Sequence, residues 1–212
     1  MKKLLLFVAV AIFAFANSNA QGEFRIGFKA GVNIASIGGD NVGALDPLVG
    51  FHVGGLVEIP LAGKFAIQPE LLYSSQGAKY GSYMGIDLGD YEEKMILGYI
   101  NVPIMGKYYI IEGLSVELGP QIGILVNAKY KGDDEDGSFD VDAKDDFNSL
   151  DVAIGIGASY RLNNGVFFSL RFNKGLMDIS DDDVEYYDGD NYYKYSYKNQ
   201  NNVFQISAGY SF

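Results

Sequence analysis

Eight stretches that alternate apolar and polar residues constrain this chain more than any other feature of its sequence. Alternation with a period of two is typical of a β-strand that has two different faces. No helical period of comparable length competes with it. The sequence therefore predicts eight strands, which cover residues 24–33, 48–60, 65–80, 95–110, 114–130, 150–162, 166–177 and 202–212.

The connections between these stretches alternate in length. Three are tight turns, at residues 61–64, 111–113 and 163–165, and the last of them contains Asn164-Gly165, a hairpin signal. Four are long and polar, at residues 34–47, 81–94, 132–149 and 178–201. Short turns at one end and long loops at the other are typical of outer-membrane barrels. We therefore expect an all-β fold, an eight-stranded antiparallel up-and-down transmembrane β-barrel with both termini at the turn end.

The two faces of the strands differ in charge. One face carries no charged residue, as contact with hydrocarbon requires. The other is polar and should fill a lumen that, with eight strands, is only wide enough for side chains. Unpaired charges there would be highly unfavourable, so we expect an ion-paired plug, with a narrow pore as the alternative. Its expected members are Arg25, Lys29, His52, Glu58, Glu70, Lys107, Glu117, Asp151, Arg161 and Arg171, and parity adds Asn127 and Lys129 to the same face.

The first 20 residues have the pattern of a secretory signal peptide. Lys2 and Lys3 precede an apolar run over residues 4–16, and Ser18-Asn19-Ala20 offers a cleavage site. The run is shorter than the 20 or so residues that a membrane-spanning helix needs. The expected domains are thus a cleaved signal peptide, residues 1–20, and a barrel, residues 21–212. We expect the barrel to reside in the outer membrane of a Gram-negative cell.

Composition narrows the partners. After loss of Lys2 and Lys3 the chain has 16 − 2 = 14 basic residues against 27 acidic ones, a formal charge of −13, so a nucleic-acid partner is not expected. The chain has no Cys, which excludes a lipidated N-terminal cysteine and disulfides. No motif indicates a cofactor, and none is expected.

A soluble periplasmic barrel of lipocalin type would show the same periodicity with its apolar face inside. Periodicity alone does not separate the two barrels. The terminal stretch alternates apolar residues and ends on Phe212, with Tyr210 two residues earlier, and it favours the membrane barrel through what the family resemblance given below implies. Pro69, Pro103 and Pro120 lie inside predicted strands, where each removes a ladder donor, so we expect local bulges at these positions.

Four segments carry a resemblance to a known family. FAIQPELLYSSQGAKY, YINVPIMGKYYI, ELGPQIGILVNAKY and LRFNKGLMDI resemble the recurrent strand motifs of the outer-membrane β-barrel domain family often labelled PorT-like. This family is similar in architecture to the OmpA and OmpX barrels. The resemblance implies an outer-membrane barrel whose last strand, with Tyr210 and Phe212, is the signal read by the barrel-assembly machinery. It also leaves open a role in a secretion pathway, which these residues do not show.

An enzyme that modifies lipid would need a His base beside a Ser nucleophile. The chain has one His, His52, on the face expected to point inward. Four serines share that face, Ser74, Ser159, Ser169 and Ser207, but no motif fixes their spacing. We expect no catalysis, and we keep a lipid-modifying enzyme as the alternative.

The two last long loops are acidic, and the second is rich in tyrosine. Residues 132–146 read GDDEDGSFDVDAKDD, which fails the EF-hand pattern because Gly132 stands where an Asp is required. We therefore expect solvated loops and no metal site. Residues 186–197 read YYDGDNYYKYSY, and tyrosine supplies large contact area at low entropic cost in recognition loops. Tyrosines that lie at the level of the lipid headgroups or pack over the barrel mouth are the alternative. The expected function is structural or surface-binding, by a monomer in lipid with an extracellular ligand at the loops.

Overall fold

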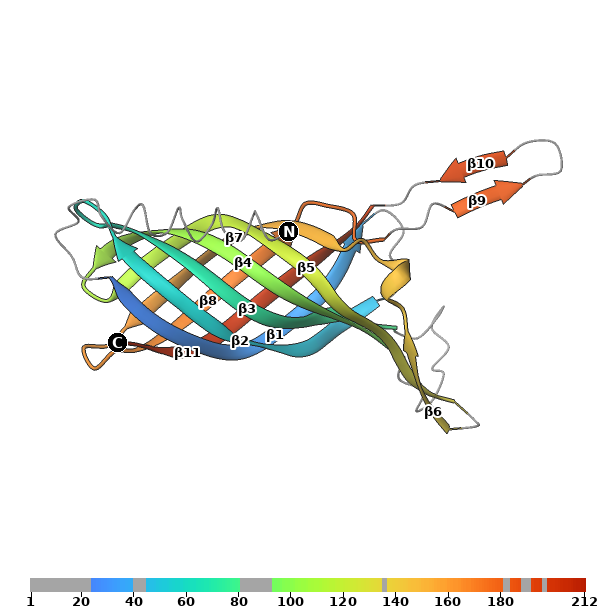
Figure 1. Ribbon diagram of the computed structural model, residues 1–212, viewed down its shortest axis with the longest axis horizontal. Coiled ribbons are helices and arrows are strands. Elements are labelled where there is room, and N and C mark those ends of the chain that lie inside the picture. The colour runs from blue at the N-terminus through green and yellow to red at the C-terminus, as the bar shows by residue number, and fades with distance from the viewer. Residues whose placement is uncertain are drawn as a thin grey trace.

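The computed structural model describes residues 24–39, 45–80, 93–134, 137–180, 184–187, 192–195 and 198–212. Eight antiparallel strands form a closed barrel, which confirms the predicted fold class (Figure 1). Within this described part of the chain, no helix is long and apolar enough to cross a membrane. The barrel strands are β1 (Arg25–Gly39), β2 (Leu45–Pro60), β3 (Phe65–Tyr80), β4 (Lys94–Ile111), β5 (Leu114–Asp134), β7 (Leu150–Arg161), β8 (Val166–Gly175) and β11 (Asn199–Ser211).

Each barrel strand pairs with the next one along the chain, and β11 closes the ring on β1. The closing ladder runs from Gly27↔Ser211 to Gly39↔Asn199. A closed ring leaves no strand edge without hydrogen bonds, which is the condition for a sheet in lipid. The C-terminus and the three tight turns lie together at one end of the barrel, here called the turn end (Figure 1).

The opposite end, called the loop end, contains more structure than the sequence predicted. β1 continues to Gly39 and β11 already begins at Asn199, so these strands extend into segments predicted as loops. β6 (Gly137–Asp142) pairs with the end of β5, and the 3-10 helix η2 (Lys144–Asp146) follows it. β9 (Val184–Tyr187) and β10 (Tyr192–Tyr195) form a separate hairpin. The predicted loop at 81–94 lies outside the described residues except at its end, 93–94.

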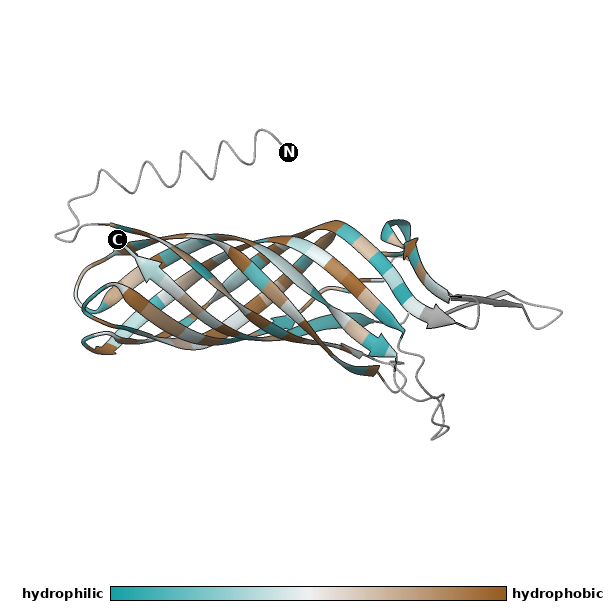
Figure 2. Cartoon of the chain, turned by 90° about the horizontal axis from the view of Figure 1, so that it is seen from below, coloured by the Kyte–Doolittle hydropathy of each residue, from teal (hydrophilic) through white to brown (hydrophobic). Residues whose placement is uncertain are grey.

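The outer face of the barrel is apolar. Hydrophobic and hydrophilic residues alternate along the strands in Figure 2, as the period of two predicts. Phe28, Leu71, Leu118, Ile156 and Phe168 are between 54% and 61% exposed on this face. An apolar outer belt that is exposed to this degree is what contact with lipid hydrocarbon requires of a barrel.

A bulge in β5 overturns two of the predicted face assignments. Gly98 pairs with Asn127, but the next residue, Tyr99, pairs with Leu125, so Val126 is an extra residue in the ladder. One extra residue moves the later side chains of the same strand to the opposite face. Leu125 and Ala128 are buried, whereas the Lys129 side chain is 37% exposed. Asn127 and Lys129 therefore do not line the lumen as predicted.

The bulges predicted at the prolines do not occur. The β3–β4 register is the same at Pro69↔Ile104 and at Leu72↔Asn101. The β5–β7 register is likewise constant through Pro120↔Ile154. A proline removes one donor without displacing its neighbours, so the ladder loses a hydrogen bond locally and keeps its register. The register shifts fall elsewhere, between Pro47 and His52, Gly98 and Tyr99, and Tyr109 and Ile111.

Candidate functional site

The middle of the lumen holds a fully buried ion-pair cluster around Arg171. Both terminal nitrogens of Arg171 donate to Glu70, at 2.9 and 2.7 Å, and its Nε donates to Glu117 Oε1 at 2.7 Å. Lys29 Nζ lies 2.8 Å from Glu70 Oε2. All four charged side chains are at most 1% exposed. Bidentate geometry of this kind gives the strongest ion pairs and offsets part of the cost of removing charges from water.

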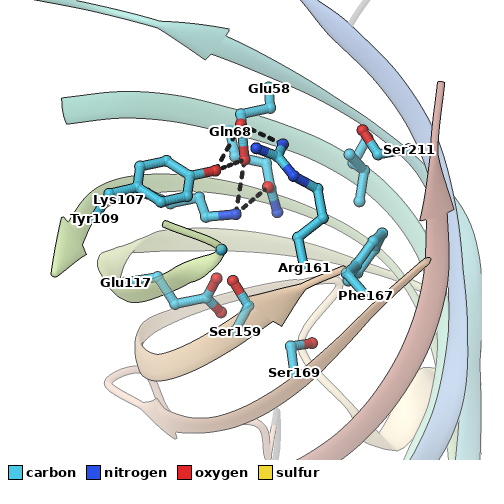
Figure 3. A pocket seen from close by; sticks show the side chains of 12 residues that line it. Glu58, Gln68, Lys107, Tyr109, Glu117, Ser159, Arg161, Phe167, Ser169 and Ser211 are labelled. Atoms are coloured by element: carbon cyan, nitrogen blue, oxygen red, sulfur yellow. Dashed lines mark hydrogen bonds and ion pairs between the residues drawn. The ribbon is translucent and has the colours of Figure 1, made fainter. Parts of the chain in front are cut away.

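A second cluster surrounds Glu58 at the turn end (Figure 3). Its carboxylate accepts hydrogen bonds from Arg25 and Lys107, each at 2.8 Å, and from Arg161 at 3.2 Å. The Tyr109 hydroxyl donates to the same carboxylate at 2.7 Å. The adjoining cavity measures about 20 Å³, which is room for about one water molecule. The turn end of the lumen is therefore closed by paired side chains.

His52 occupies a layer of uncharged polar side chains on the loop-end side of the Arg171 cluster. Its Nδ1 lies 2.8 Å from Asn33 Oδ1, and its Nε2 lies 2.8 Å from Ser207 Oγ. These contacts have the spacing of a nucleophile, a base and an orienting amide. The three side chains are nevertheless at most 4% exposed. A substrate would have no route to the serine in this arrangement.

The loop end of the lumen is filled by an apolar core. Met95, Leu97 and Leu125 come from β4 and β5, and Phe147 and Ile179 come from the segments after η2 and after β8. Asn148 holds these two segments together, because its backbone N–H donates to Ile179 O at 2.9 Å and its side chain donates to Ser180 O at 2.8 Å. Segments outside the barrel wall therefore cover its opening.

Asp151 lies where the polar layer meets this apolar core. One carboxylate oxygen accepts from the Asn201 amide at 3.3 Å, and the same amide lies 3.3 Å from the Tyr99 hydroxyl. No Lys or Arg of the described residues lies within 4 Å of it. Asp151, which the sequence predicted as a member of the lumen network, therefore joins neither ion-pair cluster.

The structure places all ten predicted lumen residues on the inner side of the barrel, but distributes them over separate layers. Four join the Arg171 cluster and four join the Glu58 cluster, whereas His52 and Asp151 lie apart. Sequence reasoning missed Tyr109 as a partner of Glu58. Tyr109 follows the inward Lys107 by two residues, so parity alone was a signal that could have found it.

The hairpin of β5 and β6 is held by exposed charges at the loop end. Asp140 lies 2.9 Å from Lys131 Nζ and 3.0 Å from Lys129 Nζ. These hydrogen bonds hold the pKa of Asp140 below its ordinary value of 3.8, and the one from Lys131 has the larger effect. Among the described residues, no three His, Cys, Asp or Glu side chains are arranged to hold a metal ion. Residues 135–136, 181–183 and 188–191 of the acidic loops lie outside the described residues.

Aromatic side chains gather where the terminal strand meets β1. Phe28, Tyr210 and Phe212 have ring centroids 5.1 to 6.5 Å apart. The Phe212 N–H donates to Ile26 O at 2.8 Å, and the Phe212 side chain is 75% exposed. Recognition of Tyr210 and Phe212 by the assembly machinery stays a prediction.

A closed eight-stranded barrel with an apolar outer belt agrees with the comparisons with known proteins. Residues 15–181 match the model of the outer membrane protein beta-barrel domain. The chain belongs to this family. The family places the protein in the outer membrane, whereas the PorT-like label stays a resemblance. No curated protein matches the sequence.

Solved structures with a similar fold include three surface or outer-membrane proteins. Ail of Yersinia pestis is 14% identical, with a TM-score of 0.49 over 90% of this chain and 100% of Ail. Neisserial surface protein A is 10% identical, with a TM-score of 0.49 over 89% and 97%. A major outer membrane protein of Thermus thermophilus is 15% identical, with a TM-score of 0.44 over 90% and 100%. Function does not follow from similarity at this level.

Proposed function

We propose that this protein is a non-catalytic surface-binding protein, in which a closed barrel anchors two hairpins outside the membrane. The observation that carries the proposal is that the lumen is filled at both ends, by ion pairs at the turn end and by the apolar core at the loop end. A barrel closed in this way offers neither a channel nor a reaction chamber. The function is then left to the segments that leave the barrel at the loop end.

Conduction and catalysis both require access that the lumen side chains deny. The turn-end cavity of about 20 Å³ is far from the water-filled channel of a porin. Ser207, His52 and Asn33 would suit acyl transfer by their spacing, but they are buried on all sides. The proposed absence of enzyme activity rests on this burial.

The hairpins supply the proposed binding surface. β9 and β10 lie beyond the barrel wall in Figure 1, and Tyr192↔Tyr187 and Tyr193↔Tyr186 are cross-strand partners. Tyrosine is the residue that recognition loops favour, because it combines a large apolar ring with a polar tip. Residues 178–201 contain seven Asp or Glu and two Lys, so the hairpin repels polyanions. A neutral glycan or a basic protein surface is the ligand class that fits.

The test compares two loop variants on whole cells. In the first, Tyr186, Tyr187, Tyr192 and Tyr193 are each replaced by Ser; in the matched control, Asp145 and Asp146 are replaced by Asn. Binding to a glycan array and to immobilised basic proteins should fall at least tenfold only in the tyrosine variant, because aromatic anchors dominate such interfaces. Equal binding by both variants and by the parent protein would exclude the hairpin as the binding surface.

Two further measurements separate the alternatives. A pore would give unitary conductance in planar bilayers, which the closed lumen predicts to be absent. A lipid-modifying enzyme would change the mass of outer-membrane lipids on expression, and Ser207→Ala would abolish this change in a folded barrel. Either result would replace the proposed function.

A further inference from the structure

The outer face of the barrel has an apolar depression near the turn end. It measures about 470 Å³ and crosses β3, β4, β5 and β7. We call it the Gly106 groove and define it by Phe65, Ile67, Gly106, Tyr108, Leu118 and Ile156. We propose that this groove binds an acyl chain of one phospholipid, whose phosphate contacts Lys64 and whose primary ammonium contacts Glu112.

The groove exists because one outward position in a row of bulky side chains is a glycine. Gly106 is the cross-strand partner of Ile67 on β3 and of Leu118 on β5, and Leu118 is in turn the partner of Ile156 on β7. Cross-strand partners on one face lie about 5 Å apart, so Gly106 opens a gap between two walls. Tyr108 limits the gap toward the turn end, where its ring centroid lies 5.0 Å from that of Phe65.

The backbone of the barrel does not require glycine at this position. A Cβ added to Gly106 would meet its nearest neighbour, Leu118 O, at 3.4 Å. By contrast, a Cβ at Gly27 or Gly119 would meet a carbonyl oxygen at 2.6 or 2.0 Å. The space above Gly106 is therefore not a by-product of close strand packing.

Lipid hydrocarbon surrounds this groove in the membrane. Its walls belong to the exposed apolar belt, in which Leu118 is 56% exposed and Ile156 61%. The groove lies at the turn end, which in barrels of this class faces the periplasm. Its occupant is therefore a chain from the periplasmic leaflet.

Two charges of opposite sign lie on the neighbouring turns at the groove's end. Lys64 directly precedes Phe65, and its Nζ donates to Ile110 O at 3.0 Å. An ammonium has three N–H groups, so Lys64 can also bind a phosphate. Glu112 is exposed in the turn between β4 and β5, two residues beyond Ile110. One cation beside one anion complements a zwitterionic headgroup that ends in a primary ammonium, as in phosphatidylethanolamine.

The experiment uses the absence of Trp from this chain. Phe65→Trp places a single reporter at the rim of the groove in the full chain, refolded in micelles. Phosphatidylethanolamine with a dibrominated acyl chain is then titrated at low mole fraction. We expect saturable quenching with a stoichiometry of one, and loss of saturation when Gly106→Leu fills the groove.

Gly55→Leu is the matched control. Gly55 is also an outward glycine, and the nearest atom to an added Cβ lies 3.8 Å away, but Gly55 does not line the groove. Quenching should be unchanged in this variant. If Gly106→Leu does not refold, Ile67→Phe fills the same space from β3. Quenching that stays unsaturable, or that is identical in the Gly106→Leu and Gly55→Leu variants, would show bulk solvation by lipid and overturn the proposal.

The headgroup is tested with Lys64→Gln and Glu112→Gln. Each loses a charge-assisted contact, so each should weaken binding by about tenfold. Phosphatidylcholine lacks the ammonium N–H groups. It should therefore bind the parent protein about as weakly as phosphatidylethanolamine binds the Glu112→Gln variant. Equal binding of phosphatidylethanolamine, phosphatidylcholine and phosphatidylglycerol would overturn the headgroup assignment. A dimer in native mass spectra that Gly106→Leu converts to monomer would assign the groove to a second copy of the chain and overturn the lipid.

Discussion

The two halves of the lumen are both filled by side chains, but those of one half are charged and those of the other are apolar. In the half toward the turn end, charged side chains pair across the barrel, with Arg171 joining Glu70 and Glu117 at mid-lumen and Lys107 joining Glu58 at the turn end. At the loop end, Leu97, Leu125 and Phe147 form an apolar core like that of a soluble protein. The difference follows from what surrounds each half. Where hydrocarbon covers the outside, alternation directs polar side chains inward; where water covers it, polar side chains point outward again.

The bulge at Val126 exchanges the two faces of β5 at its loop-end part. Before it, β5 directs Glu117 into the lumen; after it, β5 directs Ala128 inward and Lys129 outward to Asp140. One inserted residue therefore directs Lys129 out of the lumen, where its charge is paired at the surface. The two halves should consequently differ in how they respond to mutation.

The largest effect is expected from Arg171→Met. It leaves Glu70 and Glu117 without their guanidinium partner in a site that is 1% exposed, which should lower the free energy of unfolding by about 4 kcal/mol. Unfolding in urea from lipid vesicles measures this loss. Lys129→Met is the control, because its ion pair is exposed and should contribute less than about 1 kcal/mol. Similar losses for both variants would contradict the buried cluster.

Leu97→Ala tests the apolar core of the loop end. A cavity at a fully buried leucine should cost about 3 kcal/mol. The damage should be local, since Phe147 and Ile179 would loosen while the Arg171 cluster stays formed. Hydrogen exchange should rise at the amides of Asn148 and Ile179 and stay slow at Arg171. Uniform acceleration along the barrel would show that the two halves do not act separately.

Glu58→Gln should have a smaller effect than Arg171→Met. It removes the charge shared by Arg25, Lys107 and Arg161, but the side chains of Arg25 and Arg161 are 37% and 23% exposed and keep contact with water. A loss of about 1–2 kcal/mol in unfolding free energy is expected for hydrogen bonds to a charged group near solvent. A loss as large as that of Arg171→Met would show that the partly exposed Glu58 cluster contributes as much to stability as the fully buried Arg171 cluster, which contradicts the prediction.

The smallest effect concerns acid and the β5–β6 hairpin. The pKa of Asp140 is lowered by Lys131 and Lys129, so its contribution to the hairpin is present at neutral pH and is lost as pH falls through this lowered pKa, below 3.8. The protection of the β6 amides, measured as their exchange rate relative to the intrinsic rate at the same pH, should therefore decrease below that pH. Asp140→Asn should remove the pH dependence, and salt should weaken it in the wild type. A pH profile of β6 exchange unchanged by Asp140→Asn would refute the assignment.

Much of this architecture could be predicted because strand parity is a local property. The turns at residues 61–64, 111–113 and 163–165 and the apolar outer face are both visible in the sequence. The partners within the lumen were not predictable. Arg171 and Glu70 are 101 positions apart, and their contact depends on closure between β11 and β1. The Phe147 and Ile179 side chains fell in segments predicted as polar loops, although both complete the core.

Sequence alone was sufficient for the number of barrel strands, the alternation of turns and loops, and the face that meets hydrocarbon. These depend on a period of two and on solvent, and both act residue by residue. Only the tertiary structure decided the inversion at Val126, the division of the lumen into separate layers and the covering of the loop end. The layers and the cover depend on contacts between strands that are far apart in the sequence, and the inversion depends on one inserted residue, which exchanges the two faces of the rest of its strand.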